Sequence, residues 1–328
     1  MNGNLSDTEI NEVIKKYIDK KQICIISSFA SLCKRDKKEY AYLYLKCWPF
    51  CYDRDKVADI GNRIIDYNPK RVNQLLVQYI GYDIKFYECS SSKGLEHIRK
   101  ALLLNNTIVI GMDSYYCSWN SAFRKKHIRH FFIVNKIDAK TSALLCSDPF
   151  FSVDKEYRLS IDCFHKGFKN IRVIENSKEY KNMNADEICE MLLQGNEQLE
   201  DAFQDFRNDM RCESNLSMMF DSTQVETCTL IRKIREISEG RFGIAYVLNK
   251  HDEREGNKTF TNVFRCFFEL GEMWNRLNII LMKLLLSRKI NDKYVQAMLQ
   301  NIKMITEKEV LCCKLINQIQ EQRKESYK

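Results

Sequence analysis

The sequence predicts an α+β protein, with helices packed on an antiparallel sheet in an N-terminal domain and an all-helical C-terminal domain. Strand-like and helix-like segments alternate up to about residues 176–185, and apolar residues recur only at helical spacing after that point. The chain has 328 residues, of which 45% are hydrophobic, and this length suits about two domains. We therefore expect domains at residues 1–180 and 181–328, the second of which covers the cleft of the first.

The predicted helices follow from boundary residues and apolar faces. Ser6 and Glu9 form a capping box that begins the first helix. A second helix begins at Cys24 and carries an apolar stripe through Leu32. The other predicted helices are, in chain order, Lys70–Ile80, which Gly81 stops, Lys93–Leu104, a helical series from Asp186 onward, Asn262–Leu286 and Asp292–Gln320.

The predicted strands are apolar runs that either alternate with polar residues or continue unbroken. Thr107–Met112 has the sequence TIVIGM, so both of its faces are expected to be buried. His130–Val134 and Ala143–Cys146 flank a polar turn at residues 136–142, which predicts an antiparallel hairpin. The remaining predicted strands are Ile84–Cys89 and Ile171–Ile174.

The composition argues against several classes of protein. No run of about 18 uncharged apolar residues occurs, so we expect no membrane-spanning helix. The polar segment Met1–Thr8 does not resemble a secretory signal, which predicts a cytoplasmic protein whose 14 cysteines stay reduced. Neither a CxxC pair nor a Cys/His cluster with zinc spacing occurs, so no metal site is expected.

The charge and the missing nucleotide motifs limit the expected partners. A net charge of +8 is modest for this length and suits an acidic protein partner. No helix-turn-helix, zinc-finger or RNA-binding pattern accompanies it, so nucleic acid is not an expected partner. The phosphate-binding patterns GxxxxGK(S/T) and GxGxxG are both missing, so ATP and NAD are not expected as cofactors.

Cys24, His130 and Asp148 form the main candidate site, although each residue type alone is more often structural. Cys24 begins a helix, where unpaired N–H groups and the helix dipole stabilise a thiolate. His130 opens one strand of the predicted hairpin, and Asp148 follows the other strand. Their numbers average to Ala139 in the predicted turn, so we expect the two side chains to be neighbours at the open end of the hairpin.

A cysteine, a histidine and an aspartate placed in this way form a triad of the papain type. Cys24 would attack a carbonyl carbon, His130 would carry the proton, and Asp148 would fix the tautomer of the imidazole.

Five segments resemble the butirosin-biosynthesis BtrH-like acyltransferase family. They are QICIISSFASL at residues 22–32, IGMDSYY at 110–116, KKHIRHFFIV at 125–134, SDPF at 147–150 and the helix at 264–281 that is centred on Trp274. The first three are similar to the family's nucleophile helix, its strand that ends in an aspartate and aromatics, and its paired histidines before a strand. The chain departs from the family at residues 135–138, where relatives have a turn that contains glycine.

The resemblance implies a papain-like cysteine peptidase-type fold for the N-terminal domain. It also implies a cytoplasmic acyltransferase of secondary-metabolite biosynthesis. Such an enzyme would take an acyl group from the thioester of an acyl carrier protein, hold it on Cys24, and pass it to an amine or hydroxyl group. The acceptor would be a small molecule or a peptide. No cofactor of its own is implied, because the phosphopantetheine arrives on the donor and the acyl group is already activated.

Four further residues near the triad are candidates for substrate binding. His127 lies three residues before the proposed base and is the alternative base or a substrate ligand. Gln22 is a candidate oxyanion donor beside the backbone N–H of the nucleophile. Asp113 is expected to support the histidine loop or to cap a turn, and Tyr115 to line a pocket or to belong to the core.

A basic cluster, Arg124, Lys125, Lys126 and Arg129, precedes the proposed base. It is either a solvated loop or a docking site for an acidic carrier protein and its phosphate.

The sequence leaves alternative functions open. Water in place of the acceptor would make the same triad a cysteine hydrolase, either a thioesterase or a peptidase. A buried, unreactive Cys24 would instead favour a non-catalytic binding module of papain-like fold. A homodimer is compatible with the sequence, with a helical half that serves for dimerisation.

Overall fold

A computed structural model describes residues 6–18, 24–46, 48–65, 69–177, 180–222, 225 and 228–326. The chain divides into two compact units that interleave along the sequence. A helical unit comprises Met1–Lys20, Tyr44–Arg71 and Met183–Lys328, and a sheet unit comprises Lys21–Leu43 and Val72–Asn182. The expected domains at residues 1–180 and 181–328 treat each part as continuous, whereas residues 1–20 and 44–71 group with the helical unit.

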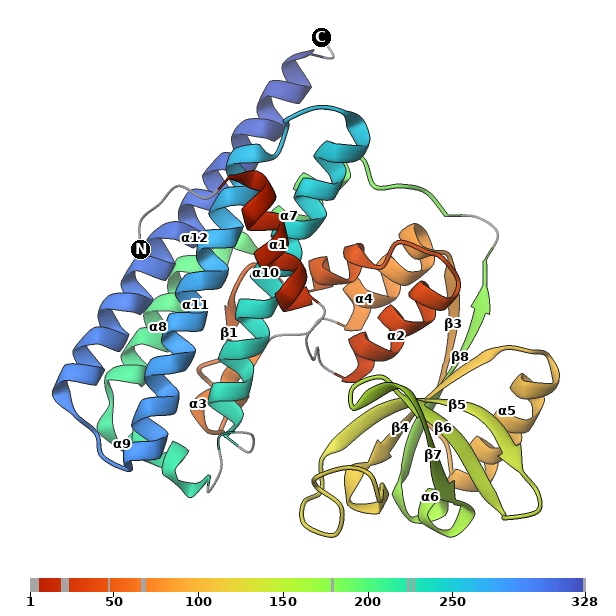
Figure 1. The fold of residues 1–328 in the computed structure, drawn as a ribbon. Coiled ribbons are helices and arrows are strands. Elements are labelled where there is room, and N and C mark those ends of the chain that lie inside the picture. The colour runs from red at the N-terminus through yellow and green to blue at the C-terminus, as the bar shows by residue number, and fades with distance from the viewer. Residues whose placement is uncertain are drawn as a thin grey trace. The chain divides into compact units, whose positions relative to one another are not determined.

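The sheet unit is built on a six-stranded antiparallel sheet with the order β3-β8-β4-β5-β6-β7 (Figure 1). In chain order its strands are β3 (Tyr82–Tyr87), β4 (Thr107–Asp113), β5 (Arg129–Asp138), β6 (Ala143–Asp148), β7 (Ser152–Ser160) and β8 (Phe168–Asn176). The fold class predicted from the sequence, α+β with an antiparallel sheet followed by helices, is confirmed at this level.

Helices flank the strands of the sheet unit. They are α2 (Cys24–Arg35), α4 (Pro69–Leu75), which begins in the helical unit and continues as the π turn η2 (Leu76–Ile80), α5 (Ser91–Leu103), the 3-10 turn η3 (Ser114–Tyr116) and α6 (Ile161–Gly167). Gly81 ends η2 with a φ of 75°, a left-handed conformation that glycine adopts without strain. Helix α2 contacts β5, and α5 contacts β4, β5 and β8.

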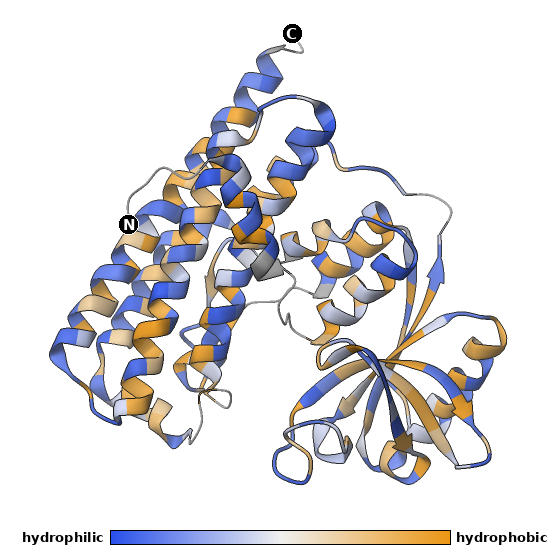
Figure 2. Cartoon of the chain, in the orientation of Figure 1, coloured by the Kyte–Doolittle hydropathy of each residue, from blue (hydrophilic) through white to orange (hydrophobic). Residues whose placement is uncertain are grey.

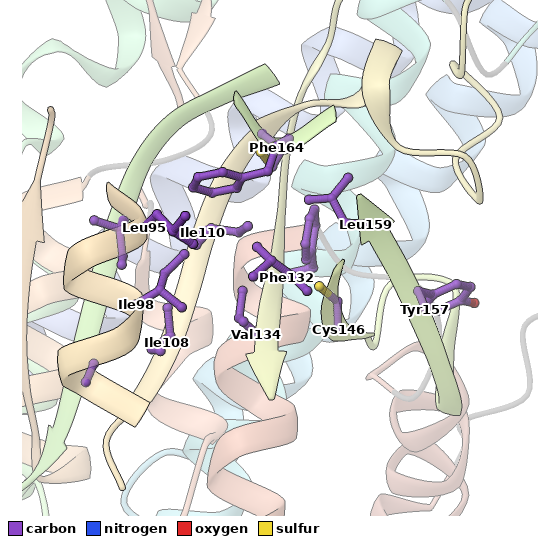
Figure 3. Close-up of a cluster of buried hydrophobic side chains, with 14 of the residues drawn as sticks. Leu95, Ile98, Ile108, Ile110, Phe132, Val134, Cys146, Tyr157, Leu159 and Phe164 are labelled. Carbon is purple, nitrogen blue, oxygen red and sulfur yellow. The ribbon is translucent and has the colours of Figure 1, made fainter. Parts of the chain in front are cut away.

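The core of the sheet unit lies between α5 and one face of the sheet. Leu95 and Ile98 of α5 pack with Ile110 of β4 and Phe132 of β5, and all four are buried (Figure 3). Because side chains alternate along a strand, the buried Ile133 of β5 points to the opposite face. Strand β5, which carries His130, is therefore packed against both α2 and α5.

The other α-helices belong to the helical unit. They are α1 (Asp7–Ile18), α3 (Ile60–Arg63), α7 (Ala185–Leu193), α8 (Leu199–Arg211), α9 (Glu213–Ser217), α10 (Thr229–Glu255), α11 (Thr261–Ser287) and α12 (Asp292–Ser326), with 3-10 turns η4 (Asn196–Gln198) and η5 (Met218–Asp221). The 3-10 turn η1 (Ala41–Lys46) begins in the sheet unit and ends in the helical unit. A two-stranded sheet of β1 (Cys51–Tyr52) and β2 (Ile64–Ile65) completes it. Hydrophobic and hydrophilic residues alternate along the long helices, as expected for a packed bundle (Figure 2).

A buried carboxylate links the segments of the helical unit. Glu309 of α12 accepts hydrogen bonds from Trp48, from Arg241 Nε at 2.8 Å and from Trp274 Nε1 at 3.1 Å. Glu309 is fully buried and Arg241 is 2% exposed. Trp48 also packs edge-on against Phe267, with ring centroids 5.1 Å apart. The segment that contains Trp48 therefore belongs to this core.

Most predicted elements are present, with three corrections. The predicted strand Ile84–Cys89 is β3, which lies two residues earlier. The predicted strand Ile171–Ile174 is the centre of the longer β8. Strand β7 at Ser152–Ser160 was not predicted at all, because four of its nine residues are charged.

Candidate active site

Cys24 is the first residue of α2, and its side chain is partly exposed. Ile25, Ile26 and Phe29 on the same helix are buried, so packing fixes the direction in which the helix starts. The backbone N–H groups of the first turn of a helix have no partner within the helix. The predicted position of Cys24 at a helix N-terminus is therefore confirmed.

His130 and Asp148 form a buried pair. The Nε2 atom of His130 lies 2.6 Å from Oδ2 of Asp148, and the two side chains are 5% and 0% exposed. The juxtaposition predicted from the hairpin is thus present. An unpaired buried charge is costly, so the pairing stabilises both side chains in this environment.

The register predicted for the hairpin is wrong by about two residues. Asp138 pairs with Ala143, and Ile133 pairs with Ser147. This register places Asp148 opposite Phe132 and not opposite His130. The cause is a bulge in β5 between Val134 and Lys136, and a turn that lies later than predicted. Asp148 reaches His130 along the diagonal of the same sheet face.

The electrostatic environment favours an imidazolium at His130. Burial lowers the pKa of His130, but hydrogen bonds to Asp148 and Cys24 and the negative charges of both groups raise it to about 9. A histidine beside a cysteine is placed to exchange a proton with the thiol. Asp148 occupies Nε2, so Nδ1 is the ring nitrogen that remains for Cys24.

These three side chains can carry out acyl transfer through a covalent intermediate. In such a reaction Cys24 would be the nucleophile, His130 would supply and remove a proton, and Asp148 would orient the ring. All three residues belong to the sheet unit.

Trp119 is a further residue of the site that the sequence did not reveal. Its Nε1–H donates to Oδ2 of Asp148 at 2.7 Å. Its ring lies against Phe132, with centroids 5.1 Å apart, and stacks on Tyr157, with centroids 5.0 Å apart. The sequence placed Trp119 at the start of a basic loop, and no local pattern links it to a residue 29 positions later.

Aromatic side chains surround the imidazole of His130. The ring centroids of Phe132, Phe150 and Phe151 lie 5.9, 5.7 and 5.5 Å from that of His130. Phe150 and Phe151 are only partly buried. These rings restrict the access of water to the His130–Asp148 pair.

His127 belongs to a second, exposed histidine–aspartate pair. Its Nδ1 lies 2.7 Å from Oδ2 of Asp113, and its side chain is 66% exposed. Its ring stacks on Tyr115 at a centroid distance of 4.4 Å, and Oδ1 of Asp113 accepts from the backbone N–H of Tyr115 at 3.1 Å. Asp113 thus both supports the histidine loop and caps η3, and His130 is the ring that interacts with Cys24.

The basic cluster Arg124, Lys125, Lys126 and Arg129 is exposed. None of the four forms an ion pair within the described ranges, and the Arg124 guanidinium lies over the Phe123 ring at 5.1 Å. The cluster is therefore open to an anionic partner. Gln22, the predicted oxyanion donor, lies outside the described residues.

Cys212 is the one fully exposed cysteine among the described residues, and the sequence did not mark it as reactive. It is exposed, and hydrogen bonds from Ser214 and from the backbone of Asn215 lower its pKa. By contrast, burial raises the pKa of Cys33, on the same helix as Cys24, to about 12. Cys212 will therefore compete with Cys24 for thiol reagents.

Within the described part of the chain, no three His, Cys, Asp or Glu side chains are grouped to hold a metal ion. No helix in the same residues is both long and apolar enough to cross a membrane.

No protein-family model matches the sequence, and no curated protein matches it significantly.

Proposed function

We propose that this protein is a cysteine-dependent acyltransferase whose nucleophile is Cys24. The observation that carries the proposal is the hydrogen-bonded association of the partly exposed Cys24 with the buried pair of His130 and Asp148. A papain-like fold of the sheet unit and membership of the BtrH-like family are part of the same proposal. They are supported by a helix that starts at the cysteine and by the antiparallel strands that carry the other two residues.

In the first half of the proposed reaction, the Cys24 thiolate attacks the carbonyl carbon of a thioester. The tetrahedral intermediate collapses as the carbon–sulfur bond to the donor breaks, and His130 gives its proton to the departing thiolate. In the second half, an amine or hydroxyl group attacks the acyl-Cys24 carbonyl and His130 accepts its proton. The bond to Cys24 breaks and the thiolate–imidazolium pair is restored.

The proposed donor is an acyl carrier protein in the cytoplasm, and the acceptor is a small molecule or a peptide. An acidic donor is supported by the exposed cations Arg124, Lys125, Lys126 and Arg129. A positively charged surface attracts a negatively charged protein and steers its approach. No cofactor is needed in this scheme, because the thioester supplies the activated acyl group.

Intact-protein mass spectrometry after incubation with an acyl-pantetheine thioester tests the nucleophile. In a Cys212→Ser background we expect one acyl adduct, which Cys24→Ala abolishes. With a triad that acts as a unit, the rate of acyl transfer should fall more than about a thousandfold in Cys24→Ala. Cys33→Ala is the matched control, since it removes a buried thiol from the same helix.

Product analysis separates the alternatives. An amide that forms only when an amine is added supports transfer, whereas free acid at the same rate with and without amine identifies a hydrolase. An adduct that persists in Cys24→Ala contradicts the assigned nucleophile. A Cys24 thiol that reacts with neither thioester nor iodoacetamide would leave a non-catalytic binding module.

A further inference from the structure

Asp148 has an uneven set of hydrogen bonds. The residue is fully buried, and both donors, Nε2 of His130 and Nε1 of Trp119, meet the same oxygen, Oδ2, at 2.6 and 2.7 Å. The other oxygen, Oδ1, is buried and has no hydrogen-bond partner among the described residues. A buried carboxylate depends strongly on its few donors, because each one offsets part of the cost of removing the charge from water.

The indole of Trp119 is held rigidly enough to aim its N–H. It stacks on Tyr157 of β7 at an interplanar angle of 25° and meets Phe132 of β5 edge-on at 77°. Two strands of the sheet therefore fix the plane of the ring. A donor fixed in this way selects one orientation of the carboxylate that it binds.

The charge of Asp148 acts on four neighbouring titratable groups, which are His130 of β5, Cys117 of the loop after η3, Cys146 of β6 and Tyr157 of β7. Burial raises the pKa of Cys117 to about 12 and also raises the pKa values of Cys146 and Tyr157, so these groups stay neutral near pH 7.

From this geometry we infer that Trp119 is a positioning residue of the triad. Its N–H holds the Asp148 carboxylate in the orientation that meets His130, and it stabilises the carboxylate charge. The inference rests on the proposed function, since it assigns Trp119 to the same site. Trp119 acts through Asp148 and does not touch the reacting atoms.

Trp119→Phe tests this role, because phenylalanine keeps an aromatic ring between Tyr157 and Phe132 but has no N–H. The measurement is the rate of carbamidomethylation of Cys24 by iodoacetamide between pH 5 and pH 9, in the Cys212→Ser background. We expect the rate near pH 7 to fall about tenfold, the size of one hydrogen bond to a charged group. The pH profile should change as well, because an Asp148 carboxylate turned away from His130 no longer supports the raised pKa of that histidine.

Trp274→Phe is the matched control. It removes an indole N–H from another buried carboxylate, Glu309, at 3.1 Å. This variant should leave the pH profile of Cys24 unchanged even if it lowers the melting temperature. Equal changes in both variants, or a wild-type profile in Trp119→Phe, would overturn the inference.

A second variant serves if Trp119→Phe does not fold, and a second measurement tests the role of Trp119 without thiol chemistry. If Trp119→Phe does not fold, benzothienylalanine at position 119 keeps the bicyclic shape and lacks the N–H. The Nε2 proton of His130, observed by NMR on histidine-labelled protein, should lose its downfield resonance in either variant. This signal does not depend on thiol chemistry. An unreactive Cys24 in the wild type would therefore refute the proposed function, while an unchanged His130 signal would refute the role of Trp119.

Discussion

His130 makes the stability of the protein depend on pH. Its pKa rises from the ordinary 6.5 to about 9 in the folded chain, so the folded chain holds this proton more tightly than the unfolded chain does. The stabilisation is complete below pH 6.5 and disappears as the pH rises through about 9. At about 1.4 kcal/mol for each pKa unit, the loss amounts to about 3 kcal/mol. Urea denaturation at pH 6, 7.5 and 9.5 measures it.

Two variants isolate this contribution. His130→Gln should remove most of the decline in unfolding free energy between pH 6 and pH 9.5. His127→Gln should keep the decline, because its ring is 66% exposed. A decline of the same size in His130→Gln would show that another group causes it.

The residue types and their spacing in the sequence predicted that Cys24, His130 and Asp148 lie close together. They did not predict which side chains surround these three residues. Cys24 and Asp148 are marked by the element boundaries at which they stand, and those boundaries depend on local sequence. Trp119 and the reactive Cys212 lack such a mark. The role of Trp119 depends on a loop that returns to the end of β6, and that of Cys212 on a turn that brings Ser214 to its sulfur at 3.0 Å.

At the scale of elements, the close approach of β4 to its neighbours sets a limit on substitution. A Cβ at Gly111 would lie 2.6 Å from Oδ1 of Asn170 and 2.9 Å from Cε1 of Phe131. Asn170 is 1% exposed and its Oδ1 accepts from Arg172, so it has little room to move. We expect Gly111→Ala to lower the unfolding free energy by about 1–3 kcal/mol, measured by urea denaturation.

Gly240→Ala is the companion substitution. Gly240 lies inside α10, and a Cβ there would meet nothing within 4 Å. Alanine should raise the unfolding free energy by about 0.5–1 kcal/mol, because glycine is a poor helix former. If Gly111→Ala is as stable as Gly240→Ala, the packing of β4 against β5 and β8 is looser than described.

Prediction of the elements failed mainly at one edge of the sheet and at the hairpin. Strand β7 is an edge strand, and edge strands carry charges that discourage aggregation, so the apolar alternation by which strands are predicted is weak in it. The bulge after Val134 inserts one residue that no hydrophobic pattern marks. By contrast, TIVIGM is buried in the centre of the sheet and was predicted to within one residue of β4.

At the scale of the whole molecule, the interleaved units predict how a fragment behaves. Residues 1–180 contain Trp48 and Phe50 without the helices that bury them, since Phe50 stacks on Phe203 and lies 5.4 Å from Trp274. We expect this fragment to bind the dye ANS strongly and to aggregate. Size-exclusion chromatography and ANS fluorescence measure both properties.

The matched fragment replaces residues 44–71 with a glycine–serine linker. It should bind less ANS and remain monomeric at higher concentration, because the unpaired apolar segment is gone. Equal ANS binding by both fragments would mean that residues 44–71 are not the source of the exposed apolar surface.

The buried contact between Trp48 and Glu309 can form only late in the synthesis of the chain. The two residues are 261 positions apart. At about 5–20 residues per second, a ribosome needs roughly 10–50 s to add the partner. Throughout that interval the newly made segment around Trp48 has no core to enter, whereas the strands of the sheet unit are complete once residue 182 has emerged. We therefore expect the nascent chain to depend on holding chaperones, and slower elongation should lower the yield of folded protein.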